Sequence, residues 1–188
     1  MDRLENRPEE MEVDIPVVPR GEPIKGPLTS VNALLSRWAM YLACVCLAGL
    51  LAVVVYGVVL RYVFNDAPAY VEQVALLLVI SVAMFGAAAG VRDAGHIGLD
   101  SLVAILPERV QFWCEVLVFL LSIVFALSLI AGGVEMASST RDNTIPTLGI
   151  SESFRYLPIV IAGVLITLFS IEHLIALFTG KEVMPSWN

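Results

Sequence analysis

The chain has 188 residues, of which 58% are hydrophobic and 15% are charged, and its formal net charge is −7. Soluble domains carry about 25% charged residues, so this composition, with a mean hydropathy of +0.83, excludes a single soluble domain. The net negative charge argues against nucleic acid as a partner, because binding to phosphates requires a basic surface.

The N-terminal segment carries much of the negative charge. Seven of the 18 acidic residues lie within the first 22 positions, interspersed with prolines. Such a segment cannot bury enough apolar surface to offset the entropy lost on ordering. We therefore expect residues 1–30 to form a disordered acidic tail. Residues 181–188 are expected to form a second short tail.

Four apolar stretches follow, each about 20 residues or longer. A helix of that length crosses roughly 30 Å of hydrocarbon. The predicted fold is an all-α membrane protein, with a four-helix membrane domain over residues 31–180. The four transmembrane helices are expected at about 38–60, 70–90, 110–134 and 156–178.

The distribution of basic residues predicts the orientation in the membrane. With the N-terminus inside, eight Lys and Arg residues fall on the inner side and three on the outer side. Cytoplasmic segments are enriched in Lys and Arg. Both termini are therefore predicted to be cytoplasmic.

The connection between the second and third spans predicts a further short helix. Apolar residues from Leu99 to Leu106 recur at the spacing of one helical face, with polar residues opposite. This pattern is typical of an amphipathic helix lying in the plane of the headgroups. We expect such an interfacial helix at about 98–106, ended by Pro107.

The same connection contains residues that bind metals in other proteins. His96 and Asp100 lie four residues apart, with Asp93 nearby. Three ligands from one turn, without a cysteine or a second histidine close in sequence, make a weak metal site. We favour the alternative that Arg92 reaches the lipid headgroups while His96 and Asp100 cap and orient the surface helix. No metal and no buried ion site are expected.

The two histidines also raise the question of haem. Ligation by two histidines requires them to face each other, and His96 and His173 could do so only at the inner rim of the bundle. Glu172 and His173 could instead pair with Arg92 or His96 if these approach the same face. No cofactor is therefore expected. A haem- or quinone-associated membrane redox subunit remains the alternative function.

The second span contains a pattern that is typical of helix contacts. Gly86 and Gly90 are separated by three alanines, and small residues at this spacing let helix backbones approach closely in membranes. The pattern indicates a packed face without identifying the helix that it meets. Near the start of the same span, Glu72 is expected at the interface, in contact with headgroups or a partner.

Several short motifs, in order along the four spans, resemble a known family. The first span ends in Arg-Tyr-x-Phe-Asn, and an acid opens the second. The second ends in Arg-x-x-x-His-Ile-x-x-Asp, followed by Leu-Pro, and Ile-Pro-Thr-Leu-Gly-Ile precedes the fourth. With the two glycines, the candidate partner-interface and structural residues are Arg61, Tyr62, Phe64, Asn65, Glu72, Gly86, Gly90, Arg92, His96, Asp100, Pro107, Pro146, Leu148 and Tyr156.

These motifs are similar to those of the small, DctQ-type membrane subunit of tripartite ATP-independent periplasmic (TRAP) transporters. One departure is that the family opens the second span with Trp-x-Glu-Glu, where this chain has Tyr70, Glu72 and Gln73. The resemblance implies a multi-pass protein of the bacterial inner membrane that is a scaffold or anchor and not an enzyme.

The resemblance also implies partners. The large multi-span membrane subunit, bound one-to-one, carries sodium-coupled transport, and a periplasmic binding protein delivers the substrate, an organic-acid anion. Lipids surround the small subunit, and no cofactor is implied. A free-standing four-helix exporter is disfavoured, because such exporters depend on an acidic residue within the first span and this chain has none there.

Overall fold

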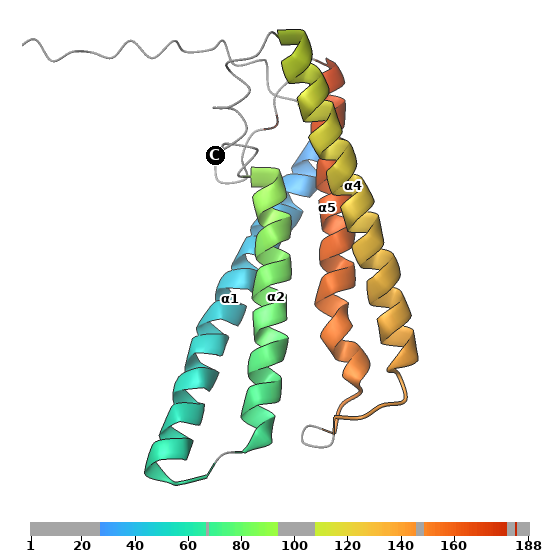
Figure 1. Ribbon diagram of the computed structural model, residues 1–188. Coiled ribbons are helices and arrows are strands. Elements are labelled where there is room, and N and C mark those ends of the chain that lie inside the picture. The colour runs from blue at the N-terminus through green and yellow to red at the C-terminus, as the bar shows by residue number, and fades with distance from the viewer. Residues whose placement is uncertain (1–26, 67, 94–107, 146–148, 180–182, 184–188) are drawn as a thin grey trace, which may run out of the picture.

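The computed structural model describes residues 27–66, 68–93, 108–145, 149–179 and 183, and this part of the chain is built from helices (Figure 1). Four of these helices are long and apolar enough to cross a membrane. The predicted all-α fold with four spans is therefore confirmed. In chain order the elements are α1 (Pro27–Val63), α2 (Ala69–Asp93), α4 (Glu108–Ser139), the 3-10 helix η1 (Glu152–Tyr156) and α5 (Leu157–Thr179).

Helix α1 begins well before the predicted start of the first span at 38. Proline suits its first position, because the first N–H groups of a helix have no intrahelical partner. The helix has 37 residues, and at 1.5 Å per residue it is about 55 Å long. Its early turns contain Asn32 and Ser36, which make contacts on other helices described below.

Two predicted features lie almost entirely outside the described residues. These are the pair of tails, at 1–30 and 181–188, and the interfacial helix at 98–106. Within the tails the structure describes only residues 27–30, which begin α1, and position 183. Both stay predictions.

The four helices form two antiparallel hairpins. Helix α1 packs on α2, and α4 packs on α5, while α2 and α5 join the hairpins. In Figure 1 the hairpins meet where α2 ends and spread apart toward their connections. We call the first the cluster end, which contains Arg92 and Glu172, and the second the loop end, which contains residues 64–66 and 140–145.

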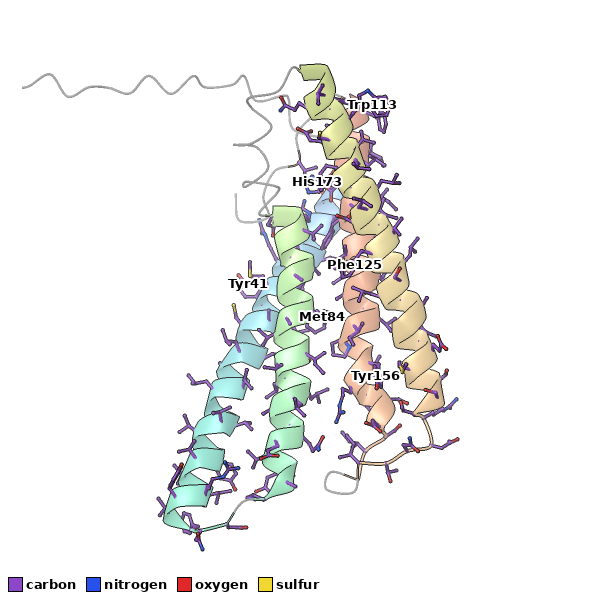
Figure 2. The ribbon with its side chains drawn as sticks, in the orientation of Figure 1. Tyr41, Met84, Trp113, Phe125, Tyr156 and His173 are labelled. Carbon is purple, nitrogen blue, oxygen red and sulfur yellow. The ribbon has the colours of Figure 1, made fainter. Side chains whose placement is uncertain are left out.

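The core is small and lies between the hairpins. It is formed by Ala88, Ala126, Ala162, Ile166 and Phe169, with Met84 packed against it between α2 and α5 (Figure 2). Lipid tails are as apolar as a protein core, so close packing rather than hydrophobic transfer drives helices together in a membrane. Alanines at the contacts serve this purpose, because they allow the backbones to approach.

One close approach between α4 and α5 depends on a glycine. A Cβ atom at Gly163 would lie 2.8 Å from Cγ1 of Ile130 and 3.0 Å from the carbonyl oxygen of Ala126. A Cβ atom at Gly86 or Gly90 would meet nothing within 4 Å. Within the described part of the chain, the predicted packed face of α2 therefore makes no close approach at these glycines, and its packing stays a prediction about another chain.

Gly163→Ala should destabilise the hairpin of α4 and α5, because the added methyl group collides with the side chain of Ile130 and crowds the carbonyl oxygen of Ala126. Overpacking of this kind costs about 1–3 kcal/mol. Gly132→Ala is the matched control, since a Cβ atom there meets nothing within 4 Å and alanine favours a helix by roughly 0.5–1 kcal/mol over glycine. Thermal unfolding in detergent should show a lower midpoint for the first variant only. Equal midpoints would contradict the close approach.

Candidate functional site

Five buried polar side chains from three helices are joined by hydrogen bonds at the cluster end. None of the five exposes more than 6% of its surface. Burial of this kind is costly unless every polar group has a partner, so the contacts among them determine what the site does. The five residues are Asn32 and Ser36 on α1, Arg92 and Asp93 on α2, and Glu172 on α5.

Arg92 is the centre of this polar cluster. Its Nε and Nη2 atoms donate to Oε2 and Oε1 of Glu172 at 3.3 and 3.5 Å. Its Nη1 donates to Oδ1 of Asp93 at 2.9 Å. A planar guanidinium can hold one carboxylate with two donors and a second carboxylate with a third, which the single ammonium of lysine cannot reproduce. The Arg92–Glu172 pair joins α2 to α5, and therefore one hairpin to the other.

Helix α1 completes the bonding of both carboxylates. Asn32 Nδ2 donates to Oε2 of Glu172 at 2.8 Å, and Ser36 Oγ donates to Oδ2 of Asp93 at 2.5 Å. Residues four apart lie on the same face of a helix, so Asn32 and Ser36 reach the cluster together. These bonds explain why α1 continues as a helix through a polar stretch that hydropathy alone places outside the span.

His173 connects the cluster to α4. Its Nε2 lies 3.1 Å from the backbone carbonyl oxygen of Arg92. A carbonyl only accepts hydrogen bonds, so Nε2 carries the hydrogen. The imidazole stacks on Phe119 of α4, with ring centroids 5.0 Å apart and planes at 7°, and Figure 2 shows His173 near the end of α2. Through His173, α4 is therefore linked to the cluster that joins the other three long helices.

Exposed tryptophans indicate how deep the cluster lies. Trp38 on α1 and Trp113 on α4 expose 66% and 69% of their surfaces, and in Figure 2 Trp113 points away from the bundle. Tryptophan is enriched where a membrane meets water. The cluster therefore lies close to one membrane boundary, in the early turns of α1 and the last turns of α2 and α5.

The cluster corrects one of the predictions. Arg92 does not reach toward headgroups but lies buried on Glu172, one of the pairings considered from the sequence. The reason is tertiary: α1 and α5 supply the partners that make burial tolerable. Asn32 and Ser36 were missed, although two polar residues four apart before an apolar run are a usable signal.

Other candidate residues lie at the loop end or outside the described residues. Arg61 and Glu72 form an ion pair at 3.3 Å, with side chains 59% and 72% exposed. Tyr62 and Phe64 are exposed, and Asn65 turns the chain with a φ of 50°. Tyr156 is half-buried at the end of η1 (Figure 2). The predicted residues outside the described part are His96, Asp100, Pro107, Pro146 and Leu148.

One further contact joins the hairpins at the loop end. Arg155 Nη2 donates to Oε1 of Gln73 at 2.7 Å, and its Nη1 lies 3.4 Å from Oε1 of Glu152 on the same 3-10 helix. Gln73 is neutral, so this bond between η1 and α2 is not an ion pair. It is a single bond from a half-buried arginine, whereas the pair at the cluster end is buried and has two donors on one carboxylate.

Comparison with known sequences identifies the family. Residues 50–180 match the DctQ component of tripartite ATP-independent periplasmic transporters. The chain belongs to this family. A putative TRAP transporter small permease protein of Haemophilus influenzae is 27% identical over 124 residues, which are 66% of this chain and 75% of that protein. The resemblance seen in the sequence is therefore confirmed, and the chain is a multi-pass membrane component of a TRAP transporter.

Two other relatives of this DctQ-type subunit have names that mention a substrate. The sialic acid TRAP transporter small permease protein SiaQ of Vibrio cholerae is 24% identical over 128 residues, which are 68% of this chain and 74% of SiaQ. The sialic acid TRAP transporter permease protein SiaT of Haemophilus influenzae is 29% identical over 147 residues. That match covers 74% of this chain but only 24% of SiaT.

Arg92→Met should destabilise the subunit more than Glu172→Leu. The first variant takes the guanidinium away from two buried carboxylates, whereas the second leaves Arg92 bonded to Asp93. Loss of one partner from a buried pair costs about 3–5 kcal/mol. Combining the two substitutions should recover part of the loss, because it removes one of the two stranded carboxylates.

Arg61→Met is the control, since it breaks an exposed pair worth under about 1 kcal/mol. Unfolding midpoints in detergent provide the comparison. Similar midpoints for Arg92→Met and Arg61→Met would show that the buried pair does not hold the hairpins together.

Proposed function

We propose that this chain is the small scaffold or anchor subunit of a sodium-coupled, binding-protein-dependent transporter for an organic-acid anion. It packs one-to-one on a large transport subunit and carries out no chemistry itself. The observation that supports this most is the use of its buried charges. Arg92, Asp93 and Glu172 are engaged with one another and with α1, so they serve to hold helices rather than to bind a transported ion.

The outward surface supports a packing role. In the most apolar stretch of α1 only 6% of the residues are buried, against 39% in the corresponding stretch of α5. Much of α1 is therefore left for lipid or for a neighbouring protein. The open faces at Gly86 and Gly90 on α2 add small residues, which let a helix of another chain approach closely.

The match to SiaT supports a large partner. This chain aligns with only 24% of that single permease chain, so a segment like this one is covalently joined there to a much longer sequence. Two polypeptides that function together in one organism are often joined in another. We therefore infer that the present chain works against a separate large subunit.

The names of two relatives support the class of substrate. SiaQ and SiaT are both named for sialic acid, which is a carboxylic acid and an anion at neutral pH. We propose an organic-acid anion for the complex to which this chain belongs. The sodium coupling, and delivery by a periplasmic binding protein that docks on the complex, are inferred from the family resemblance.

Transport should require the partner. The chain alone, reconstituted in vesicles, should give no substrate-dependent uptake in a sodium gradient, and with its large subunit it should co-purify at a one-to-one ratio. Uptake should then need both the binding protein and sodium. Uptake by this chain alone, or separate elution of the two subunits in mild detergent, would refute the scaffold function.

The proposed orientation places both termini in the cytoplasm of a bacterial inner-membrane protein. Single cysteines at Asn143 and Ser186, in a chain whose native cysteines have been replaced, test it in intact cells. A membrane-impermeant thiol reagent should label the cysteine at position 143 and not the one at 186. The reverse pattern would invert the topology.

A further inference from the structure

A groove at the loop end is not explained by the scaffold function. It has a volume of about 320 Å³ and runs between α1 and α2. Val54 and Val58 on α1 and Ala75 on α2 line its deeper part, while Arg61 and Glu72 line it closer to the connection between the helices. The groove therefore has apolar walls at one end and two opposite charges at the other.

The floor of the groove is fixed by a close contact between α1 and α2. A Cβ atom at Gly57 would lie 2.8 Å from Cγ1 of Val71, so the absence of a side chain at Gly57 is what allows these helices to touch. Both residues also line the groove. The space above this contact is consequently a surface groove on a packed helix pair, and it cannot be closed by moving the two helices together.

The charged end of the groove lies at the level of the headgroups. Arg61 directly follows the uncharged stretch from Trp38 to Leu60. The hydroxyl oxygens of Tyr56 and Tyr70 lie 3.2 Å apart close by on the same two helices, and tyrosines are enriched at membrane–water interfaces. The groove therefore begins at the headgroups and extends into the hydrocarbon.

The ion pair at this end is free to take further partners. Arg61 Nη2 and Glu72 Oε1 are 3.3 Å apart, with side chains 59% and 72% exposed. An exposed pair of this kind contributes under about 1 kcal/mol to stability. Each side chain can therefore bind a second group of opposite charge at little cost in free energy.

We propose that the groove binds one phospholipid with a phosphate and a primary ammonium group in its headgroup, that is, phosphatidylethanolamine. One acyl chain lies along Val54, Val58 and Ala75. The guanidinium of Arg61 donates to the phosphate, a pairing that charge-assisted hydrogen bonds make strong. The ammonium donates to Glu72.

Charge complementarity selects this headgroup over two others. The quaternary ammonium of phosphatidylcholine has no N–H and cannot donate a hydrogen bond to Glu72. Phosphatidylglycerol has no cationic group, so it leaves the carboxylate of Glu72 beside an anion.

The test is lipid titration of the full-length chain in complex with its large subunit, or alone if the complex does not form, followed by native mass spectrometry. After delipidation, the sample is titrated with phosphatidylethanolamine, phosphatidylcholine and phosphatidylglycerol carrying identical acyl chains. The wild type should bind the first about tenfold more tightly than the others, which corresponds to roughly 1.4 kcal/mol. Equal affinities for the three lipids, or no bound lipid because the large subunit fills the groove, would overturn the proposal.

Two substitutions of the residues that bind the headgroup separate the contributions of the two charges. Glu72→Gln should abolish the preference for phosphatidylethanolamine over phosphatidylcholine without lowering the affinity for phosphatidylglycerol. Arg61→Gln should lower the affinity for all three lipids. Arg141→Gln is the matched control, because Arg141 is an exposed arginine at the loop end of the other hairpin. A preference that survives Glu72→Gln, or that Arg141→Gln removes, would refute the assignment of the site.

Two further variants test the path of the acyl chain. Ala75→Phe fills the groove and should lower the affinity for all three lipids alike. Val79→Phe, one turn further along α2 and exposed outside the groove, should not. Equal effects of these two substitutions would place the lipid elsewhere. The site lies entirely on this chain, so its failure would leave the proposed scaffold function intact.

Discussion

The arrangement of this subunit depends on a guanidinium and a carboxylate that are both removed from water. Arg92 and Glu172 lie near the edge of the bilayer, where little water reaches their charges. Each can be buried only because it is paired with the other. Their geometry fixes α2 against α5, and the bonds from Asn32 and Ser36 then fix α1. An apolar contact would tolerate sliding of one helix along another, whereas a forked pair specifies one register.

This constraint matters more here than it would in a soluble bundle. In the described part of the chain, the apolar cluster between the hairpins has five buried residues, three of them alanines. Burial of such side chains contributes little when the surrounding lipid is equally apolar. Specificity must therefore come from polar bonds and from close backbone contacts such as the one at Gly163. A subunit held in this way can leave most of its apolar surface facing outward. That is the surface that a membrane scaffold needs.

The four spans could be predicted because hydropathy and length act locally, and the family could be recognised because its motifs are contiguous in sequence. The polar cluster could not, because its members are separated by up to 140 positions. Nothing near Asn32 reveals that Glu172 will lie beside it, so the helical turns of α1 that precede position 38 were not predicted, and Arg92 was expected at the headgroups. The glycines show the same limit: Gly86 and Gly90 match a sequence pattern, while the tight contact at Gly163 depends on what α4 places opposite it.

The two ends of the molecule differ in stiffness. Hydrogen bonds of buried charged groups join α1, α2 and α5 at one end, and a bond from Arg155 to the neutral Gln73 links the hairpins at the other. The helices are long levers: a rotation of about 5° at the cluster displaces a point 20 residues away, at roughly 30 Å, by about 2.6 Å. Small angular fluctuations at the fixed end thus become ångström-scale changes in the spacing of the hairpins at the loop end.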